Sequence, residues 1–97
     1  MQCQLSESLV REIANFARKY NIERIVLFGS RARGTNSPRS DIDIAVIGGD
    51  VDLFSIDISE NADTLLMFDI VPLDNGITDE LRNEIDRDGV IIYEKNG

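Results

Sequence analysis

The chain has 97 residues, of which 42% are hydrophobic and 29% are charged, and its net charge is −8. This length predicts one small domain over residues 1–97, without a second lobe to close over a substrate. The acidic excess argues against nucleic-acid binding, and no segment is apolar for long enough to cross a membrane or to act as a cleavable signal, so we expect a soluble cytoplasmic protein. With no histidine and one cysteine, the sequence excludes the usual zinc sites and a disulfide framework.

The spacing of apolar residues predicts the elements of the first half of the chain. Residues 6–20 place apolar side chains three and four positions apart, which predicts an amphipathic helix with a serine N-cap. The run RIVLF, residues 24–28, ends at a glycine and predicts a buried strand, and residues 30–34 leave room for one helical turn. The alternation in DIDIAVI, residues 41–47, predicts a second strand.

The second half of the chain continues the alternation of helix and strand. Residues 51–62 are assigned to a helix capped by Asp50, although their apolar positions fit neither helical nor strand periodicity cleanly. Three further elements are expected: a strand over 64–73, a helix that contains Ile77, Leu81 and Ile85, and a strand over 90–94. This order predicts an α/β (α+β) fold with a small mixed β-sheet and helices banked mainly on one face.

The stretch that joins the first two strands indicates a chemical role. Gly29 and Ser30 end the first apolar run, ten residues follow, and Asp41 and Asp43 then lie in the next apolar run. Carboxylates are costly in such a setting unless a cation meets them. Residues two apart on a strand point the same way, so both carboxylates can reach a pair of metal ions about 4 Å apart.

A third carboxylate, Asp69, lies in the apolar strand expected over 64–73. If this strand pairs with the strand of the other two aspartates, the three carboxylates converge. Oxygen ligands without histidine or thiolate favour Mg²⁺ or Mn²⁺, which substrate phosphates and water complete. Gly29 allows close backbone approach, Ser30 adds a hydroxyl, and the helical turn that follows directs N–H groups at an anion. The sequence therefore predicts a phosphate site beside a two-metal site.

Other interpretations of the same stretch stay open. Arg31, Arg33 and Arg39 could contact a phosphate, lie in solvent on a loop, or balance nearby aspartates. A glycine-serine step is often only a turn, and paired aspartates on a strand are often solvated edge residues.

The stretch GSRARGTNSPRSDIDIAV resembles the signature of the DNA polymerase β-like nucleotidyltransferases, in which a Gly-Ser pair, ten residues and Asp-x-Asp follow one another. Over nearly its whole length the chain is similar to the minimal nucleotidyltransferases, called MNT. The resemblance implies a polymerase β palm-like nucleotidyltransferase fold. It also implies that Gly29 and Ser30 bind the nucleotide, and that Asp41, Asp43 and Asp69 are the catalytic, metal-binding carboxylates.

The resemblance also implies partners. Minimal members are typically encoded beside a HEPN-domain protein, and such pairs are similar to toxin–antitoxin systems in which the MNT protein transfers AMP from ATP to the HEPN toxin. We therefore expect an antitoxin that acts on a HEPN partner, using ATP or another nucleoside triphosphate with two Mg²⁺ ions, or Mn²⁺. An acidic surface would suit a basic partner.

Two alternative functions stay open at this point. One is a non-catalytic module that neutralises a toxin by occlusion, and the other is a nucleotidyltransferase that modifies a small molecule such as an aminoglycoside. Neither nucleic acid nor a membrane is expected as a partner, and the oligomeric state is left open.

Overall fold

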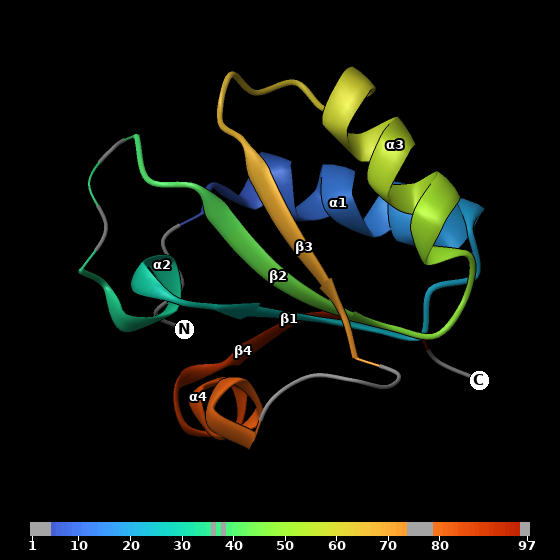
Figure 1. The fold of residues 1–97 in the computed structure, drawn as a ribbon. Helices are drawn as coiled ribbons and strands as arrows, with labels where there is room; N and C mark the ends of the chain where they lie inside the picture. Colours follow the sequence, from blue (N-terminus) through green and yellow to red (C-terminus); the bar gives the residue numbers. More distant parts are fainter. Residues whose placement is uncertain (1–4, 36, 38, 74–78, 96–97) are drawn as a thin grey trace.

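A computed structural model describes residues 5–35, 37, 39–73 and 79–95 of the chain (Figure 1). The helices and strands alternate as the sequence predicts. In chain order they are α1 (Glu7–Lys19), β1 (Arg24–Phe28), α2 (Ser30–Arg33), β2 (Ile42–Ile47), α3 (Val51–Asn61), β3 (Phe68–Pro72), α4 (Asp79–Asp88) and β4 (Val90–Glu94).

The strands form one mixed sheet in the order β3-β2-β1-β4. Strand β1 is antiparallel to β2 and β4, whereas β2 and β3 are parallel. Phe28 is the Cα partner of Asp43, and Asp43 is the Cα partner of Asp69. The end of β1 and the starts of β2 and β3 therefore lie together, and we call this the aspartate end of the sheet.

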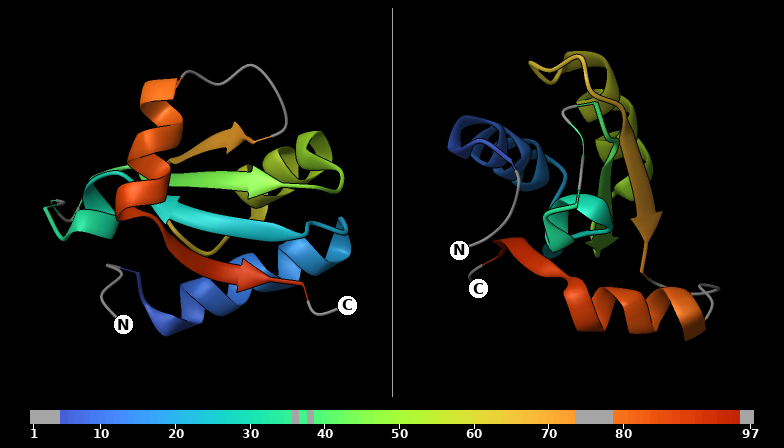
Figure 2. Two further views of the ribbon diagram at one scale, coloured as in Figure 1. Left: turned by 90° about the horizontal axis from the view of Figure 1, so that it is seen from below. Right: turned by 90° about the vertical axis from the view of Figure 1, so that its left-hand side faces the viewer.

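Helices cover the two faces of the sheet unequally (Figures 1 and 2). Helices α1 and α3 pack on one face, and α4 lies across the other, where Ile85 contacts Val26, Phe28 and Ala45. The buried members of the larger cluster are Leu9, Ile13, Ala17, Ile22, Ile25, Leu27, Ile42, Ile44, Val46, Phe54 and Ile58. Because side chains alternate along β2, Asp43 lies on the α4 side of the sheet, opposite the larger cluster.

Side-chain caps fix where the two longest helices begin. The hydroxyl of Ser6 accepts a hydrogen bond from the Leu9 N–H at 3.2 Å, so the predicted serine N-cap is Ser6 and α1 begins at Glu7. The carboxylate of Asp50 accepts a hydrogen bond from the Leu53 N–H, also at 3.2 Å, and caps α3 as predicted. Both caps satisfy amides that have no partner within the helix itself.

The third strand is shorter than the sequence predicts. Strand β3 begins at Phe68, whereas we expected a strand over 64–73. The Leu66 N–H donates to the Thr64 hydroxyl at 3.1 Å, and the Thr64 N–H donates to the Ala62 carbonyl at 2.8 Å. These local bonds take the backbone groups that a strand would pair across the sheet, so the chain enters β3 through an irregular segment.

Two further boundaries bear on the site. Asp41 lies just before β2, because the strand begins at Ile42 rather than at residue 41. Ile77, which we placed in the last helix, lies outside the described residues, as does Pro38. None of the helices in the described ranges is both long and apolar enough to cross a bilayer.

Candidate functional site

Asp43 and Asp69 lie side by side at the aspartate end of the sheet. Their strands are parallel neighbours, and the pairs Ile42–Phe68 and Ile44–Ile70 flank them in the register. Partner residues on adjacent strands project from the same face, so both carboxylates lie on the α4 side. Asp43 is half-buried and Asp69 is exposed. The structure thus brings together one aspartate from the Asp-x-Asp pair and the third predicted carboxylate.

The surroundings of Asp43 disfavour its negative charge. Burial, and after it the charge and hydrogen bonding of Asp69, raise the pKa of Asp43 from 3.8 to about 6. The charges of Asp41 and Glu84 act in the same direction but more weakly. A carboxylate in this position is stabilised by a proton or by a cation.

Gly29 lies directly against the Asp43 carboxylate where β1 ends. Its φ of 74° is in the left-handed region, and a Cβ at this position would overlap Asp43 Oδ2. Only glycine meets both conditions without strain. The N–H groups of Ala32 and Arg33 donate to the Gly29 carbonyl, both at 3.2 Å, and close the turn that begins at Ser30. The start of α2 therefore lies beside the carboxylates.

Asp41 is exposed, but the residue before it is held by a buried arginine. The Arg31 side chain is 6% exposed, and its Nε and Nη2 donate to the Ser40 carbonyl at 3.1 and 2.9 Å. Arg31 therefore ties α2 to the backbone immediately before Asp41. Of the interpretations left open for Arg31, a solvated loop residue is wrong. No pattern in the sequence distinguishes a buried arginine here from its exposed neighbours.

Arg33 connects α2 to α4. Its Nη1 lies 3.7 Å from Glu84 Oε2 and 3.9 Å from Asp88 Oδ2. Glu84 was not singled out from the sequence, yet it acts on Asp43 across the face that α4 covers. Glu84 and Asp88 are four residues apart on a predicted helix, and this spacing indicates an acidic face. The third arginine, Arg39, is exposed.

The donor set suits a hard divalent cation. Within the ranges that the structure describes, no three Cys, Asp or Glu side chains are close enough, as placed, to hold a metal ion. However, Asp43 and Asp69 supply paired oxygen donors whose mutual repulsion a cation would relieve. Asp41 is exposed two residues before Asp43, and its charge acts on the Asp43 carboxylate. These oxygen ligands fit Mg²⁺ or Mn²⁺.

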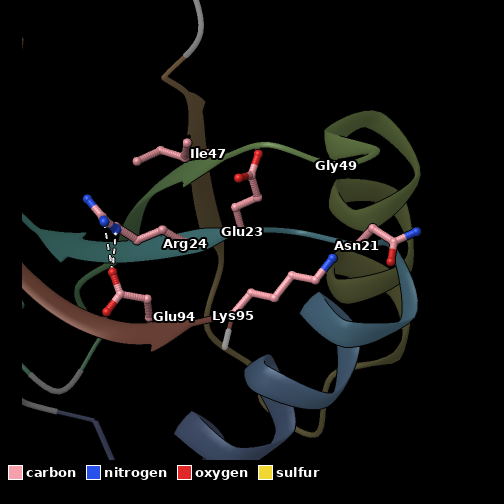
Figure 3. Close-up of a pocket in the computed structure, with 7 residues that line it drawn as sticks. All are labelled: Asn21, Glu23, Arg24, Ile47, Gly49, Glu94 and Lys95. Atoms are coloured by element: carbon pink, nitrogen blue, oxygen red, sulfur yellow. Dashed lines mark hydrogen bonds and ion pairs between the residues drawn. The ribbon is translucent and has the colours of Figure 1, made fainter. Parts of the chain in front are cut away.

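A hollow of about 750 Å³ lies at the other end of the sheet (Figure 3). Its lining consists of Asn21, Glu23, Arg24, Ile47, Gly49, Glu94 and Lys95. Arg24 and Glu94 pair across it, with Nε at 2.9 Å and Nη2 at 2.7 Å from Glu94 Oε2. None of the predicted site residues lines this hollow, so we place the candidate site on the open surface at the aspartate end.

The sequence matches one protein family over most of its length. The family is described as Polymerase beta, Nucleotidyltransferase, and the match covers residues 11–97. No protein with a curated description matches the chain significantly.

Several solved structures share the fold. A chain of a toxin–antitoxin crystal structure with AMP-PNP is 24% identical, with a TM-score of 0.71 over 89% of this chain and 73% of that chain. A mutant of the toxin–antitoxin MntA-HpeT is 26% identical, with a TM-score of 0.69 over 95% and 75% of the two chains. The tri-AMPylated Shewanella oneidensis HEPN toxin in complex with MNT antitoxin gives 20% identity and a TM-score of 0.65, over 94% and 74%. The described chain therefore has the fold expected from its sequence.

Proposed function

Because the chain belongs to the polymerase beta nucleotidyltransferase family, we propose that it transfers AMP from ATP to a HEPN-domain toxin and so acts as its antitoxin. The observation that carries this proposal is the pairing of Asp43 with Asp69 beside Gly29. Two structural neighbours support the choice of nucleotide and partner, since one was solved with AMP-PNP and another contains an AMPylated HEPN toxin with an MNT antitoxin.

Asp41, Asp43 and Asp69 would hold the divalent cations, which we propose to be two Mg²⁺ ions, with Mn²⁺ as a substitute. When bound, such ions screen the triphosphate and stabilise the charge that develops at the α-phosphate. The protein contributes the spacing of the carboxylates, because the sheet register fixes Asp43 next to Asp69. The hydrogen bonds from Arg31 fix the backbone at Ser40, from which Asp41 projects.

Gly29 and Ser30 would bind the triphosphate. The absence of a side chain at Gly29 lets phosphate oxygens approach the backbone beside Asp43. The Ser30 hydroxyl and the amides at the start of α2 are donors that suit these oxygens. Together they would orient the α-phosphorus towards the carboxylates.

The transfer itself requires an acceptor hydroxyl and a place for its proton. The acceptor oxygen forms a bond to the α-phosphorus, the bond from the α-phosphorus to the oxygen bridging the β-phosphate breaks, and pyrophosphate leaves. Asp69 is exposed on β3, at the edge of the sheet, where an incoming acceptor can reach it. We assign to Asp69 the removal of the acceptor proton.

One experiment separates catalysis from occlusion. The chain is coexpressed with a HEPN-domain protein encoded beside it, and the transfer of label from α-³²P-ATP is measured together with the growth inhibition caused by the partner. We expect the wild type to label and neutralise the partner, and the double variant Asp41→Asn/Asp43→Asn to do neither while remaining folded. If the variant neutralises fully and no label moves in either case, the protein acts by occlusion. Label on a small molecule but not on the partner would favour the small-molecule alternative.

A further inference from the structure

We infer that the exposed side chains of Leu65 and Met67 form the surface on which the acceptor docks, and that this surface takes a protein segment bearing apolar and basic side chains beside the acceptor hydroxyl. We call these two residues the lead-in surface, because they precede β3. The role of the bound segment as an acceptor rests on the proposed transferase function, whereas its binding can be measured independently.

The first observation is the unusual exposure of the lead-in surface. Leu65 is fully exposed, at 103% of its reference area, and Met67 is 70% exposed. Leu66, between them, packs against the larger core cluster. Leu66 therefore holds the segment against the core, whereas Leu65 and Met67 are exposed to solvent. Neither exposed side chain contributes to the core, so both are available for contact with a partner.

The second observation is the position of the lead-in surface relative to the aspartates. The Ile42 N–H donates to the Met67 carbonyl at 2.9 Å, so Met67 lies beside the start of β2. Two residues further along, Asp69 is the partner of Asp43. Leu65 and Met67 thus precede Asp69 on the same segment, at the same end of the sheet.

The third observation is the direction from which an acceptor can approach. In the sheet order β3-β2-β1-β4, the phosphate site follows β1, and the carboxylates lie on β2 and β3. With the triphosphate bound after β1 as proposed above, the side of the carboxylates that it leaves free is the side away from β1. That side is the β3 edge, which the lead-in surface borders.

The charge of the surrounding chain defines the chemistry of the bound segment. Residues 41–81 contain 11 Asp or Glu and no Lys or Arg. Three exposed carboxylates from this range, Glu60, Asp63 and Asp69, flank the lead-in surface in sequence. A segment with basic residues around an apolar contact is complementary to this surface, whereas an acidic segment would be repelled.

A second exposed apolar pair provides a matched control. Leu53 and Ile56 on α3 are 51% and 57% exposed. However, α3 packs on the face of the sheet opposite Asp43, as its buried residues Phe54 and Ile58 show. A partner bound to the outer side of α3 would not reach Asp69.

The test measures binding of a fluorescein-labelled peptide that has a central hydroxyl-bearing residue flanked by leucines and arginines, in the presence of Mg²⁺ and AMP-PNP. Two comparison peptides replace the leucines by serine or the arginines by glutamate. The proteins are the wild type, Leu65→Ser/Met67→Ser and Leu53→Ser/Ile56→Ser, each checked for folding by circular dichroism. All four positions are more than half exposed, so both variants are expected to fold.

We expect the wild type to bind the first peptide about tenfold more tightly than either comparison peptide, and the Leu65→Ser/Met67→Ser variant to lose this preference. The Leu53→Ser/Ile56→Ser variant should bind as the wild type does. The inference is overturned if no peptide binds or if the Leu65→Ser/Met67→Ser variant keeps full affinity. It is also overturned if the Leu53→Ser/Ile56→Ser variant loses as much affinity as the Leu65→Ser/Met67→Ser variant does. If the peptide binds as expected but neither it nor a HEPN partner receives label, the proposed transfer is wrong and the docking surface stands.

Discussion

Asp43 and Asp69 are paired residues on adjacent parallel strands, so the sheet holds two carboxylates next to each other on one face. This arrangement has a cost, because burial and the neighbouring charge raise the pKa of Asp43 to about 6. Packing alone does not require it, since an asparagine of the same shape would remove the repulsion. The pair is understandable if a cation occupies the site during function.

The first prediction concerns stability in the absence of metal. The folded state raises the pKa of Asp43 from 3.8 to about 6, so the contribution of Asp43 to stability is greatest below pH 3.8 and declines as the pH rises from 3.8 to about 6. Asp43→Asn should remove this decline. A shift of this size corresponds to about 3 kcal/mol, and screening by solvent reduces the expected gain at pH 7.5 to about 1–2 kcal/mol. Urea denaturation in EDTA at pH 4 and pH 7.5 measures it.

A control variant distinguishes this effect from a general loss of negative charge. Asp86 is exposed on α4, and Asp86→Asn makes the same change in net charge. The unfolding free energy of Asp86→Asn should change between pH 4 and pH 7.5 by the same amount as that of the wild type. An equal gain from both variants would mean that net charge, and not the Asp43–Asp69 pair, limits stability.

The second prediction concerns ligand binding. ATP should bind tightly only with a divalent ion, because the triphosphate would otherwise face three carboxylates. Calorimetry in Mg²⁺ and in EDTA should show an affinity at least about tenfold weaker in EDTA. Equal affinities in the two buffers would mean that the aspartates are not metal ligands.

The third prediction concerns the buried brace at Ser40. Arg31→Met keeps much of the side-chain volume but removes the donors to the Ser40 carbonyl. Loss of hydrogen bonds from a buried charged group to a half-buried carbonyl should lower the unfolding free energy by about 2–3 kcal/mol. Arg39→Met, at an exposed position of the same loop, should change it by less than about 0.5 kcal/mol. Similar losses in both variants would contradict a bracing role for Arg31.

The sequence predicts the elements well wherever one periodicity dominates. Helix α1 and strands β1, β2 and β4 lie within two residues of their expected ranges, because their apolar residues repeat with a helical or an alternating period. The range expected for β3 is too long at its start. The alternation of apolar residues continues back to Leu65, but hydrogen bonds to Thr64 and Ala62 hold that segment out of the sheet. Local pattern cannot show which backbone groups find partners elsewhere.

The geometry of the site depends on tertiary pairing, which spacing does not specify. The spacing of Asp41 and Asp43 is visible in the sequence, but their relation to Asp69 requires that β2 and β3 be parallel neighbours in one particular register. A shift by one residue would place Asp69 on the opposite face. The burial of Arg31 is likewise set by how α2 packs beside the loop, and not by its neighbours in sequence.

The last prediction uses two glycines that both have a positive φ but differ in ψ and in their surroundings. Gly29 and Gly34 flank α2 with φ of 74° and 78°, but ψ is −155° at Gly29 and 17° at Gly34. Alanine in the left-handed conformation of Gly34 carries a backbone strain of about 1 kcal/mol, whereas the conformation of Gly29 is one that essentially only glycine adopts. Among the residues that the structure describes, none has an atom within 4 Å of a Cβ at Gly34, whereas a Cβ at Gly29 would overlap the Asp43 carboxylate. Gly34→Ala should therefore lose about 1 kcal/mol of stability and keep Mg²⁺-dependent ATP binding.

Gly29→Ala should lose that binding as well, because the Asp43 carboxylate must leave its position beside Gly29 to make room for the methyl group. Its stability should fall further than that of Gly34→Ala, by about 1–3 kcal/mol, which is typical of inserting a group into filled space. Calorimetry with Mg²⁺ and ATP, alongside urea denaturation of both variants, measures the two effects separately. If Gly29→Ala binds ATP as well as Gly34→Ala does, the close approach of Gly29 to Asp43 serves packing alone, and the phosphate site lies elsewhere.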